Sequence, residues 1–154
     1  MSTAIDHIVK QYTDLQHGDC WIGVNFKNAL HGIDAAKAAH KVSADTNSTW
    51  QLVNHLTYWR TIVVNRLEGS NDRPAFADFL LPDEVNESNW KQALLDFEAA
   101  YHLLIKTIKH FDEAYLHYPS PKKEQTYYEL LLGALQHDAY HLGQIVLLKK
   151  EAFN

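Results

Sequence analysis

The most constraining feature of the sequence is a run of apolar residues that recurs at alternating steps of four and three between residues 88 and 111. This spacing places about one side chain per turn on the same face, so the run predicts a long amphipathic helix. The stripe consists of Trp90, Leu94, Phe97, Tyr101, Leu104, Ile108 and Phe111. Other helices must cover this apolar face, because the chain has no alternating pattern typical of β-strands.

Three more segments carry helical signals. A shorter stripe near the N-terminus has the same spacing and consists of Ile5, Ile8, Tyr12 and Leu15. Ser48 and Gln51 have the spacing of a capping box, and they predict the start of a second long helix that stops at Gly69. Thr126 and Glu129 repeat this spacing at the start of a fourth long helix.

Together these patterns predict an all-α protein, a single domain over residues 1–154 built as a four-helix bundle. Residues 21–40 predict one or two short helical segments. About nineteen residues separate Gly69 from Ser88, which is long for a connection between helices. At up to ~3.3 Å per residue this loop can cross the ~30 Å length of a helix, so the second and third helices can run in the same direction.

Composition and charge exclude several classes of partner. The chain has ten histidines, one cysteine and a formal net charge of -5. Because an acidic surface repels phosphate groups and no Lys/Arg cluster reverses the charge, no nucleic-acid partner is expected. No stretch approaches the ~18 apolar residues of a membrane span, and no apolar leader opens the chain, so we expect a cytoplasmic protein without a membrane partner.

Three histidines lie where a buried polar group needs a partner. His137 and His141 are four residues apart on the fourth helix, so both imidazoles lie on one side and can reach one ion. Chance alone gives roughly 0.6 such pairs in this composition, so the spacing is weak by itself. The pair flanks the apolar arc of the helix, with Asp138 near the centre of that arc. His55 falls on the apolar stripe of the second helix at a matching height, so the three can converge.

The convergence predicts one divalent metal ion per chain on His55, His137 and His141. Three imidazoles suit zinc or nickel first, and also iron, cobalt or manganese, and they leave an open coordination position. The alternative is three core histidines with separate hydrogen-bond partners. We expect Asp138 to bond a ligand imidazole or another nearby polar group. The candidates for a substrate-binding wall are Trp21, Trp59 and the apolar loop residues 76–81.

Three stretches of the sequence resemble the DinB-like superfamily of metal-binding four-helix bundles. They are NSTWQLVNHLTYW at residues 47–59, RLEG ending at Gly69, and HDAYHLGQIVLLKK at residues 137–150. Trp21 with Gly23 is also similar to the first turn of that family. The resemblance implies an up-down-down-up bundle with a long crossover loop between its second and third helices. It also implies that His55, His137 and His141 are the metal ligands.

Characterised members of this superfamily include thiol-dependent enzymes that use bacillithiol, mycothiol or glutathione in S-transfer or isomerisation. The resemblance therefore implies a metal-dependent thiol S-transferase that acts on a small-molecule substrate with a low-molecular-weight thiol. Related bundles also favour a homodimer. Two alternatives stay open, a metal-dependent hydrolase with metal-bound hydroxide and a non-catalytic metal-binding bundle.

Overall fold

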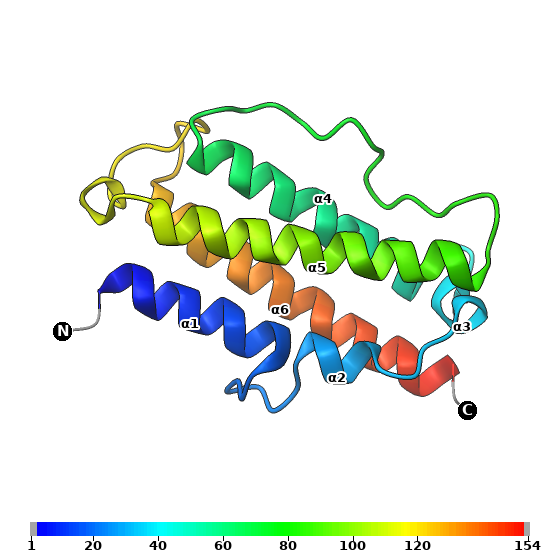
Figure 1. The fold of residues 1–154 in the computed structure, drawn as a ribbon. Helices are drawn as coiled ribbons and strands as arrows, with labels where there is room; N and C mark the ends of the chain where they lie inside the picture. The colour runs from blue at the N-terminus through cyan, green and yellow to red at the C-terminus, as the bar shows by residue number, and fades with distance from the viewer. Residues whose placement is uncertain (1–2, 153–154) are drawn as a thin grey trace.

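The computed structural model describes residues 3–152, which form helices and loops without a β-strand in that range (Figure 1). In chain order the helices are α1 (Ala4–His17), α2 (Phe26–Leu30), α3 (Ala35–Ala39), α4 (Thr49–Leu67), α5 (Glu87–His110), the 3-10 helix η1 (Glu113–Tyr115) and α6 (Tyr127–Ala152). The predicted all-α class is confirmed. None of the helices between residues 3 and 152 combines the length and the apolar character that a bilayer crossing requires.

The two capping signals of the sequence start the helices that carry the histidines. The Ser48 hydroxyl accepts a hydrogen bond from the Gln51 backbone N–H, and the Gln51 side-chain oxygen accepts one from the Ser48 backbone N–H, at the start of α4. Thr126 and Glu129 make the same reciprocal pair at the start of α6. Each box satisfies backbone donors that the first helical turn leaves without an intrahelical partner, and this fixes where both helices begin.

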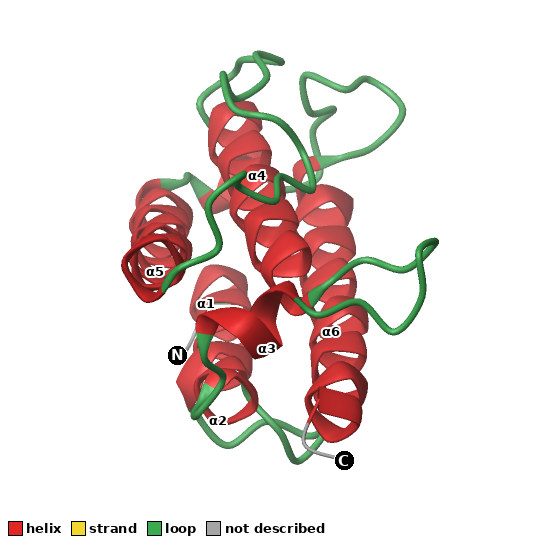
Figure 2. Cartoon of the chain, turned by 90° about the vertical axis from the view of Figure 1, so that its right-hand side faces the viewer, coloured by secondary structure: helices red, strands yellow, loops and turns green. Residues whose placement is uncertain are grey.

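The four long helices pack around a shared interior. The view along the bundle shows α4 between α5 and α6, with α1 on the opposite side (Figure 2). Trp50 in the first turn of α4 contacts Trp90 in the first turn of α5, with ring centroids 5.1 Å apart. These two helices therefore run in the same direction. Helix α6 runs opposite to α4, because Arg66 near the end of α4 and Leu130 near the start of α6 line one cavity.

The loop of residues 68–86 makes the common direction of α4 and α5 possible, because it returns along the bundle from the end of one helix to the start of the other (Figure 1). Side chains of α4 hold this loop in place. The Asn65 amide donates to the Asp72 carbonyl at 2.9 Å, and the Asn54 amide donates to the Leu80 carbonyl at 2.7 Å. The loop is thus bound along the outer side of α4.

Buried apolar side chains form two clusters along the bundle, and a polar layer separates them. One cluster contains Phe26, Trp50, Leu56, Trp90 and Phe97, and the other contains Ile8, Tyr12, Val64, Leu104 and Leu131. Along α4 and α6 the buried polar side chains of Arg60, Asp138 and His141 lie between the two clusters, and buried His55 lies beside the first cluster, between Val53 and Leu56. Because a buried polar group is costly unless it is paired, the contacts of this layer decide what the bundle can do.

Candidate metal centre

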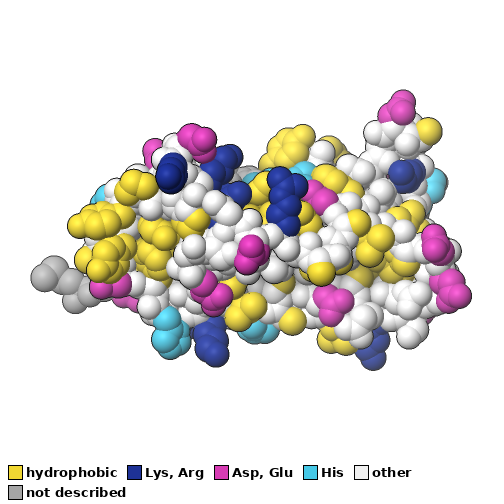
Figure 3. All heavy atoms as spheres, turned by 90° about the horizontal axis from the view of Figure 1, so that it is seen from above, with side chains coloured by type: hydrophobic (Ala, Val, Ile, Leu, Met, Phe, Trp, Pro, Cys, Tyr) yellow, Lys and Arg dark blue, Asp and Glu magenta, His cyan; other side chains and the backbone are white. Residues whose placement is uncertain are grey.

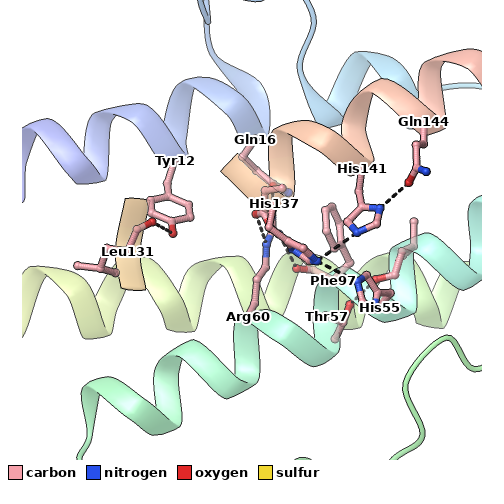
Figure 4. Close-up of polar contacts among 12 residues, drawn as sticks. Tyr12, Gln16, His55, Thr57, Arg60, Phe97, Leu131, His137, His141 and Gln144 are labelled. Atoms are coloured by element: carbon pink, nitrogen blue, oxygen red, sulfur yellow. Dashed lines mark hydrogen bonds and ion pairs between the residues drawn. The ribbon is translucent and has the colours of Figure 1, made fainter. Parts of the chain in front are cut away.

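Helices α4 and α6 bring the three predicted ligands together in the polar layer. The Nε2 atom of His137 lies 2.9 Å from Nε2 of His55 and 3.1 Å from Nε2 of His141 (Figure 4). One ligand atom from each residue lies within 4.8 Å of the other two. His55 and His141 are buried, whereas His137 is half-buried. We call these residues the three-histidine cluster.

Hydrogen bonds on the other ring nitrogen fix how two of these imidazoles point. The Nδ1 atom of His55 donates to the Asp78 carboxylate at 2.6 Å, and Nδ1 of His141 donates to the Gln144 side-chain oxygen at 2.6 Å. A carboxylate and an amide oxygen only accept hydrogen bonds, so both imidazoles carry their proton on Nδ1. The lone pairs of their Nε2 atoms therefore point into the cluster, as metal ligation requires.

This arrangement fits a divalent ion better than it fits a purely hydrogen-bonded cluster. Lone pairs that face each other across about 3 Å repel unless a proton or a cation lies between them. A proton on Nε2 of His137 gives one good hydrogen bond, to His55 or to His141, whereas an ion attracts all three nitrogens. Zinc–nitrogen bonds of 2.0–2.1 Å in tetrahedral geometry separate the nitrogens by about 3.3 Å, close to the observed spacing.

The carboxylate of Asp78 offers a direct test, because it fixes the tautomer of His55 and strengthens its ring as a donor to metal. We expect Asp78→Asn to weaken zinc binding by about tenfold or more, since partners of metal-bound imidazoles typically contribute ~10–100-fold. Asp83→Asn removes an exposed carboxylate from the same loop and should leave the affinity unchanged. Competition with a chromogenic chelator measures both variants. Equal affinities in the two would show that Asp78 does not support the centre.

The pKa values of the cluster predict how metal binding depends on pH. Burial lowers the pKa of His55 and of His141 below the ordinary value of 6.5, while the hydrogen bonds to Asp78 and Gln144 oppose the shift. Both imidazoles are thus neutral at pH 7. We expect zinc affinity to fall as the pH drops below about 6.5 and through these lowered pKa values, because protons then compete with the ion. An affinity that stays constant from pH 5 to 8 in chelator competition would contradict histidine ligation.

The same lowered pKa values predict how the free energy of unfolding of the metal-free protein changes with pH. Below about pH 6.5 the unfolded chain takes up protons on His55 and His141, whereas the folded chain resists until the pH reaches the lowered pKa values. The contribution of these two groups to the free energy of unfolding therefore decreases as the pH falls through this window. It is fully present above pH 6.5.

Aromatic side chains enclose the cluster. The Phe79 ring stacks on the His55 ring, with centroids 3.8 Å apart and planes 13° from parallel. Phe79 has a φ of 52°, a left-handed conformation that a bulky residue adopts at a cost of ~1–3 kcal/mol and that often marks a functional site. The Trp59 ring also lies next to the cluster, with its centroid 5.8 Å from that of His137 and 6.2 Å from that of His55. These rings cover part of the imidazole surface and reduce its contact with solvent.

Two other predicted site residues make no hydrogen bond to the three-histidine cluster. The side chain of Trp21 is fully exposed at 101% in the turn after α1, so the structure does not bring it to the cluster. A turn residue has no periodic pattern that fixes where its side chain points. Asp138 is 2% exposed, but its Oδ1 lies 3.7 Å from Nδ1 of His137, which is too long for a hydrogen bond. Its hydrogen-bond partner is Arg60, so Asp138 bonds another nearby polar group and not a histidine of the cluster.

Arg60 and Asp138 form the second half of the polar layer. The Asp138 carboxylate accepts a hydrogen bond from Nε of Arg60 at 3.0 Å, and the same Oδ2 atom lies 2.9 Å from Nη2 in an ion pair. Nη2 also donates to the Gln16 side-chain oxygen at 2.9 Å (Figure 4), and the guanidinium carbon lies 4.2 Å from the centroid of the Phe97 ring. Both charges are buried and paired, so the ion pair tethers α4 to α6 one turn away from the cluster.

The site residues predicted from the sequence do not include Asp78, Gln144 or Arg60, although two of these three carry a signal. Gln144 carried a usable signal, because it follows His141 by three residues and therefore shares its helical face. Arg60 carried one too, as a lone cation in an apolar helix segment that needs a buried anion. Asp78 carried none, since its loop has no periodicity and its contact with His55 spans 23 residues of sequence.

A cavity of about 190 Å³ opens beside the cluster between α4 and α6. His137 is one of its lining residues, so a ligand in the cavity can approach the side of the cluster that His137 occupies. Its apolar wall includes Trp59, Val63, Leu104 and Leu130. The cluster within residues 3–152 supplies three ligand atoms, and a tetrahedral ion would keep one position for a further ligand. The arrangement can therefore combine metal ligation with the binding of a small molecule.

Comparison with known proteins places the chain in a family. The sequence profile of the DinB superfamily matches residues 24–145, a range that includes all three histidines, Asp78 and Gln144. No curated protein matches the chain, and no solved structure does. The family match covers well over half of the sequence and agrees with the resemblance of residues 47–59 and 137–150. The chain therefore belongs to the DinB superfamily.

Proposed function

We propose that the protein is a metal-dependent thiol S-transferase that joins a low-molecular-weight thiol to a small electrophilic substrate. The observation that supports this best is the convergence of three Nε2 atoms at the edge of a cavity, with His137 belonging to both. Closed structural metal sites use four protein ligands, whereas catalytic sites keep one position for water or substrate. Three histidines beside a cavity fit the second kind of site. Membership of the DinB superfamily supports the same proposal.

A divalent ion held on His55, His137 and His141 supplies a Lewis-acid centre when bound, and such a centre lowers the pKa of a coordinated thiol or water. The residues of the chain prepare that centre. Asp78 and Gln144 hold two of the imidazoles in the tautomer that ligation needs. Phe79 and Trp59 keep bulk water from the rings, which strengthens the electrostatic interactions at the site.

The character of the cavity wall favours an organic electrophile over a purely inorganic one. The Trp59 ring and three aliphatic side chains supply an apolar surface, and a substrate carbon skeleton that covers this surface gains about 25 cal/mol per Å² removed from water. A volume of about 190 Å³ is below the ~300–1,000 Å³ typical of pockets for drug-sized ligands. The substrate part that enters is therefore small.

A conjugation assay tests the proposal. Zinc- or nickel-loaded protein would be incubated with monochlorobimane and, in turn, with bacillithiol, mycothiol and glutathione, and conjugate formation followed by fluorescence. We expect at least one thiol to be conjugated faster than in the uncatalysed reaction, with the excess lost in His137→Ala. His102→Ala removes an exposed histidine from α5 and should keep the activity.

Two outcomes of this assay would contradict the proposal. Turnover of none of the thiols by fully metal-loaded protein argues for a non-catalytic metal-binding bundle. Hydrolysis of p-nitrophenyl acetate that needs the metal but no thiol argues for the hydrolase alternative. Metal content is measured on each sample, so that a failure of the chemistry is distinguished from a failure of loading.

A further inference from the structure

The cavity beside the cluster contains hydrogen-bond donors that nothing in the described chain satisfies. Within residues 3–152, two buried side-chain nitrogens lack a hydrogen-bond partner, Nε1 of Trp59 and Nε of Arg66. Both residues line this cavity together with His137. Buried donors are rarely left without an acceptor, and such exceptions call for an explanation. Their location on one cavity, next to the metal ligands, indicates a ligand that brings acceptors.

The charges around the cavity indicate the sign of that ligand. Its lining holds three cationic side chains, Arg60, Arg66 and Lys122, and one carboxylate, Asp138. Arg60 neutralises the Asp138 carboxylate through a hydrogen bond of 3.0 Å and an ion-pair contact of 2.9 Å. The side chains of Arg66 and Lys122 make no hydrogen bond or ion pair with any residue in the range 3–152. Two positive charges thus remain without a counter-ion beside an apolar wall.

Further positive charge lies on the outer side of Arg66. Arg66 and Trp59 also line a second cavity of about 140 Å³, whose lining includes Arg73 and Asp78 of the loop 68–86. The Asp78 carboxylate is engaged by His55, whereas Arg73 adds a positive charge. Burial and the neighbouring Arg73 lower the pKa of Arg66 below its ordinary value, because both disfavour its charged form. Seen from the side of that loop, Lys and Arg side chains lie among hydrophobic ones on this face (Figure 3). An anion bound at Arg66 would relieve this repulsion.

We propose that the cavity lined by Trp59, Arg66 and Lys122 binds an oxyanion group, a carboxylate or a phosphate, carried by the substrate. The proposal rests on the function proposed above and names the substrate class, an anionic electrophile. Trp59 Nε1–H only donates, and a guanidinium presents its N–H groups as a fork, so an acceptor-only oxyanion complements both. Lys122 adds a flexible charge at the rim.

The cationic residues and the histidine cluster lie at different ends of the cavity, and this separation predicts how the substrate is oriented. Arg66 and Lys122 lie towards the end of α4 and the start of α6, whereas His137 lies deeper along both helices. A substrate with its oxyanion on Arg66 therefore extends its remaining atoms along the apolar wall towards the three-histidine cluster. The charged group serves recognition, while the reacting part lies at the metal side of the cavity.

A titration followed by NMR tests the proposal without relying on activity. The probe is the indole N–H signal of Trp59 in zinc-loaded, ¹⁵N-labelled protein, assigned with Trp59→Phe. The titrants are succinate, inorganic phosphate and the neutral analogue succinamide. We expect succinate, phosphate or both to shift this signal to saturation while succinamide does not, and the tighter of the two anions identifies the oxyanion. Arg66→Gln should weaken anion binding by about tenfold or more, because it removes a charged donor.

Matched variants sharpen the test. Arg66→Lys keeps the charge without the fork and should show an intermediate loss. Lys122→Gln should weaken binding about threefold, whereas Lys123→Gln, which changes the exposed neighbour outside the cavity lining, should stay within about twofold of wild type. Because Arg66 has no partner to lose, its variants should fold, and circular dichroism checks this.

Three results would overturn the inference: a Trp59 signal that neither anion moves, equal response to succinamide, or equal anion affinity in wild type and Arg66→Gln. The last result would place the anion on the metal. Zinc content is determined on the same samples. If the protein holds zinc and conjugates thiols but fails the titration, only the oxyanion site is wrong. If it passes the titration without holding zinc, the proposed function fails and the anion site stands.

Discussion

Replacing His55, His137 or His141 with alanine is expected to abolish tight binding of a divalent ion. Zinc binding to four-ligand peptide sites yields roughly 10–16 kcal/mol, or about 2.5–4 kcal/mol per ligand. Loss of one imidazole from a three-ligand site should therefore weaken the affinity by on the order of 100- to 1,000-fold. Isothermal titration calorimetry with zinc, and elemental analysis of protein purified without a histidine tag, measure affinity and stoichiometry.

Two exposed histidines on α5 provide the control. His102→Ala and His110→Ala each remove an imidazole that lies outside the cluster, and both should retain one ion per chain with wild-type affinity. Circular dichroism should show a helical fold in every variant, because the two apolar clusters do not depend on the ion. Wild-type stoichiometry and affinity in all three cluster variants would disprove the site.

Asp138→Asn is expected to lower the free energy of unfolding by about 3–5 kcal/mol, because it leaves the buried Arg60 guanidinium without its counter-charge. Both side chains are only 3% exposed, so solvent cannot replace the lost carboxylate. Chemical denaturation of the metal-free protein measures the effect. The zinc affinity of the folded variant should stay within about threefold of wild type, since Asp138 makes no hydrogen bond to His137.

A double replacement separates the ion pair from other roles of the two residues. Arg60→Met with Asp138→Leu exchanges the pair for apolar side chains and should recover most of the lost stability, as is often found for buried ion pairs. Gln16 would lose its bond to Arg60 but keep its own donation to Glu98 at 2.8 Å. A single Asp138→Asn variant as stable as wild type would show that the pair contributes nothing to the bundle.

The long helices could be predicted because their signals are local and repeat. The stripe from Trp90 to Phe111 corresponds to α5, whose last helical residue is His110, and the box of Ser48 and Gln51 caps α4 as expected. A helical period needs only the spacing of neighbouring turns, so a single sequence reveals it. Loop residues lack that repetition. The side-chain direction of Trp21 and the left-handed backbone of Phe79 therefore could not be derived.

For the candidate site too, local helical spacing could be predicted from the sequence, whereas contacts between distant segments could not. His137 and His141 follow from spacing on one helix, and His55 follows from its place on an apolar stripe. The contacts that complete the site join distant segments. Asp78 reaches His55 only because α4 anchors the loop, through Gln51 and Asn54, and such pairings depend on the folded structure as a whole. Sequence reasoning thus located the three histidines of the cluster but not the groups that orient them.

The loop of residues 68–86 touches His55 through both the Asp78 carboxylate and the Phe79 ring, so its conformation and the occupancy of the centre are linked equilibria. Linkage is reciprocal: if the seated loop improves ion binding, then the ion must hold the loop in place by the same free energy. A segment that has left α4 is open to proteases, whereas a seated one is protected. Resistance of this segment to cleavage is therefore expected to report what fraction of a sample of the protein carries metal.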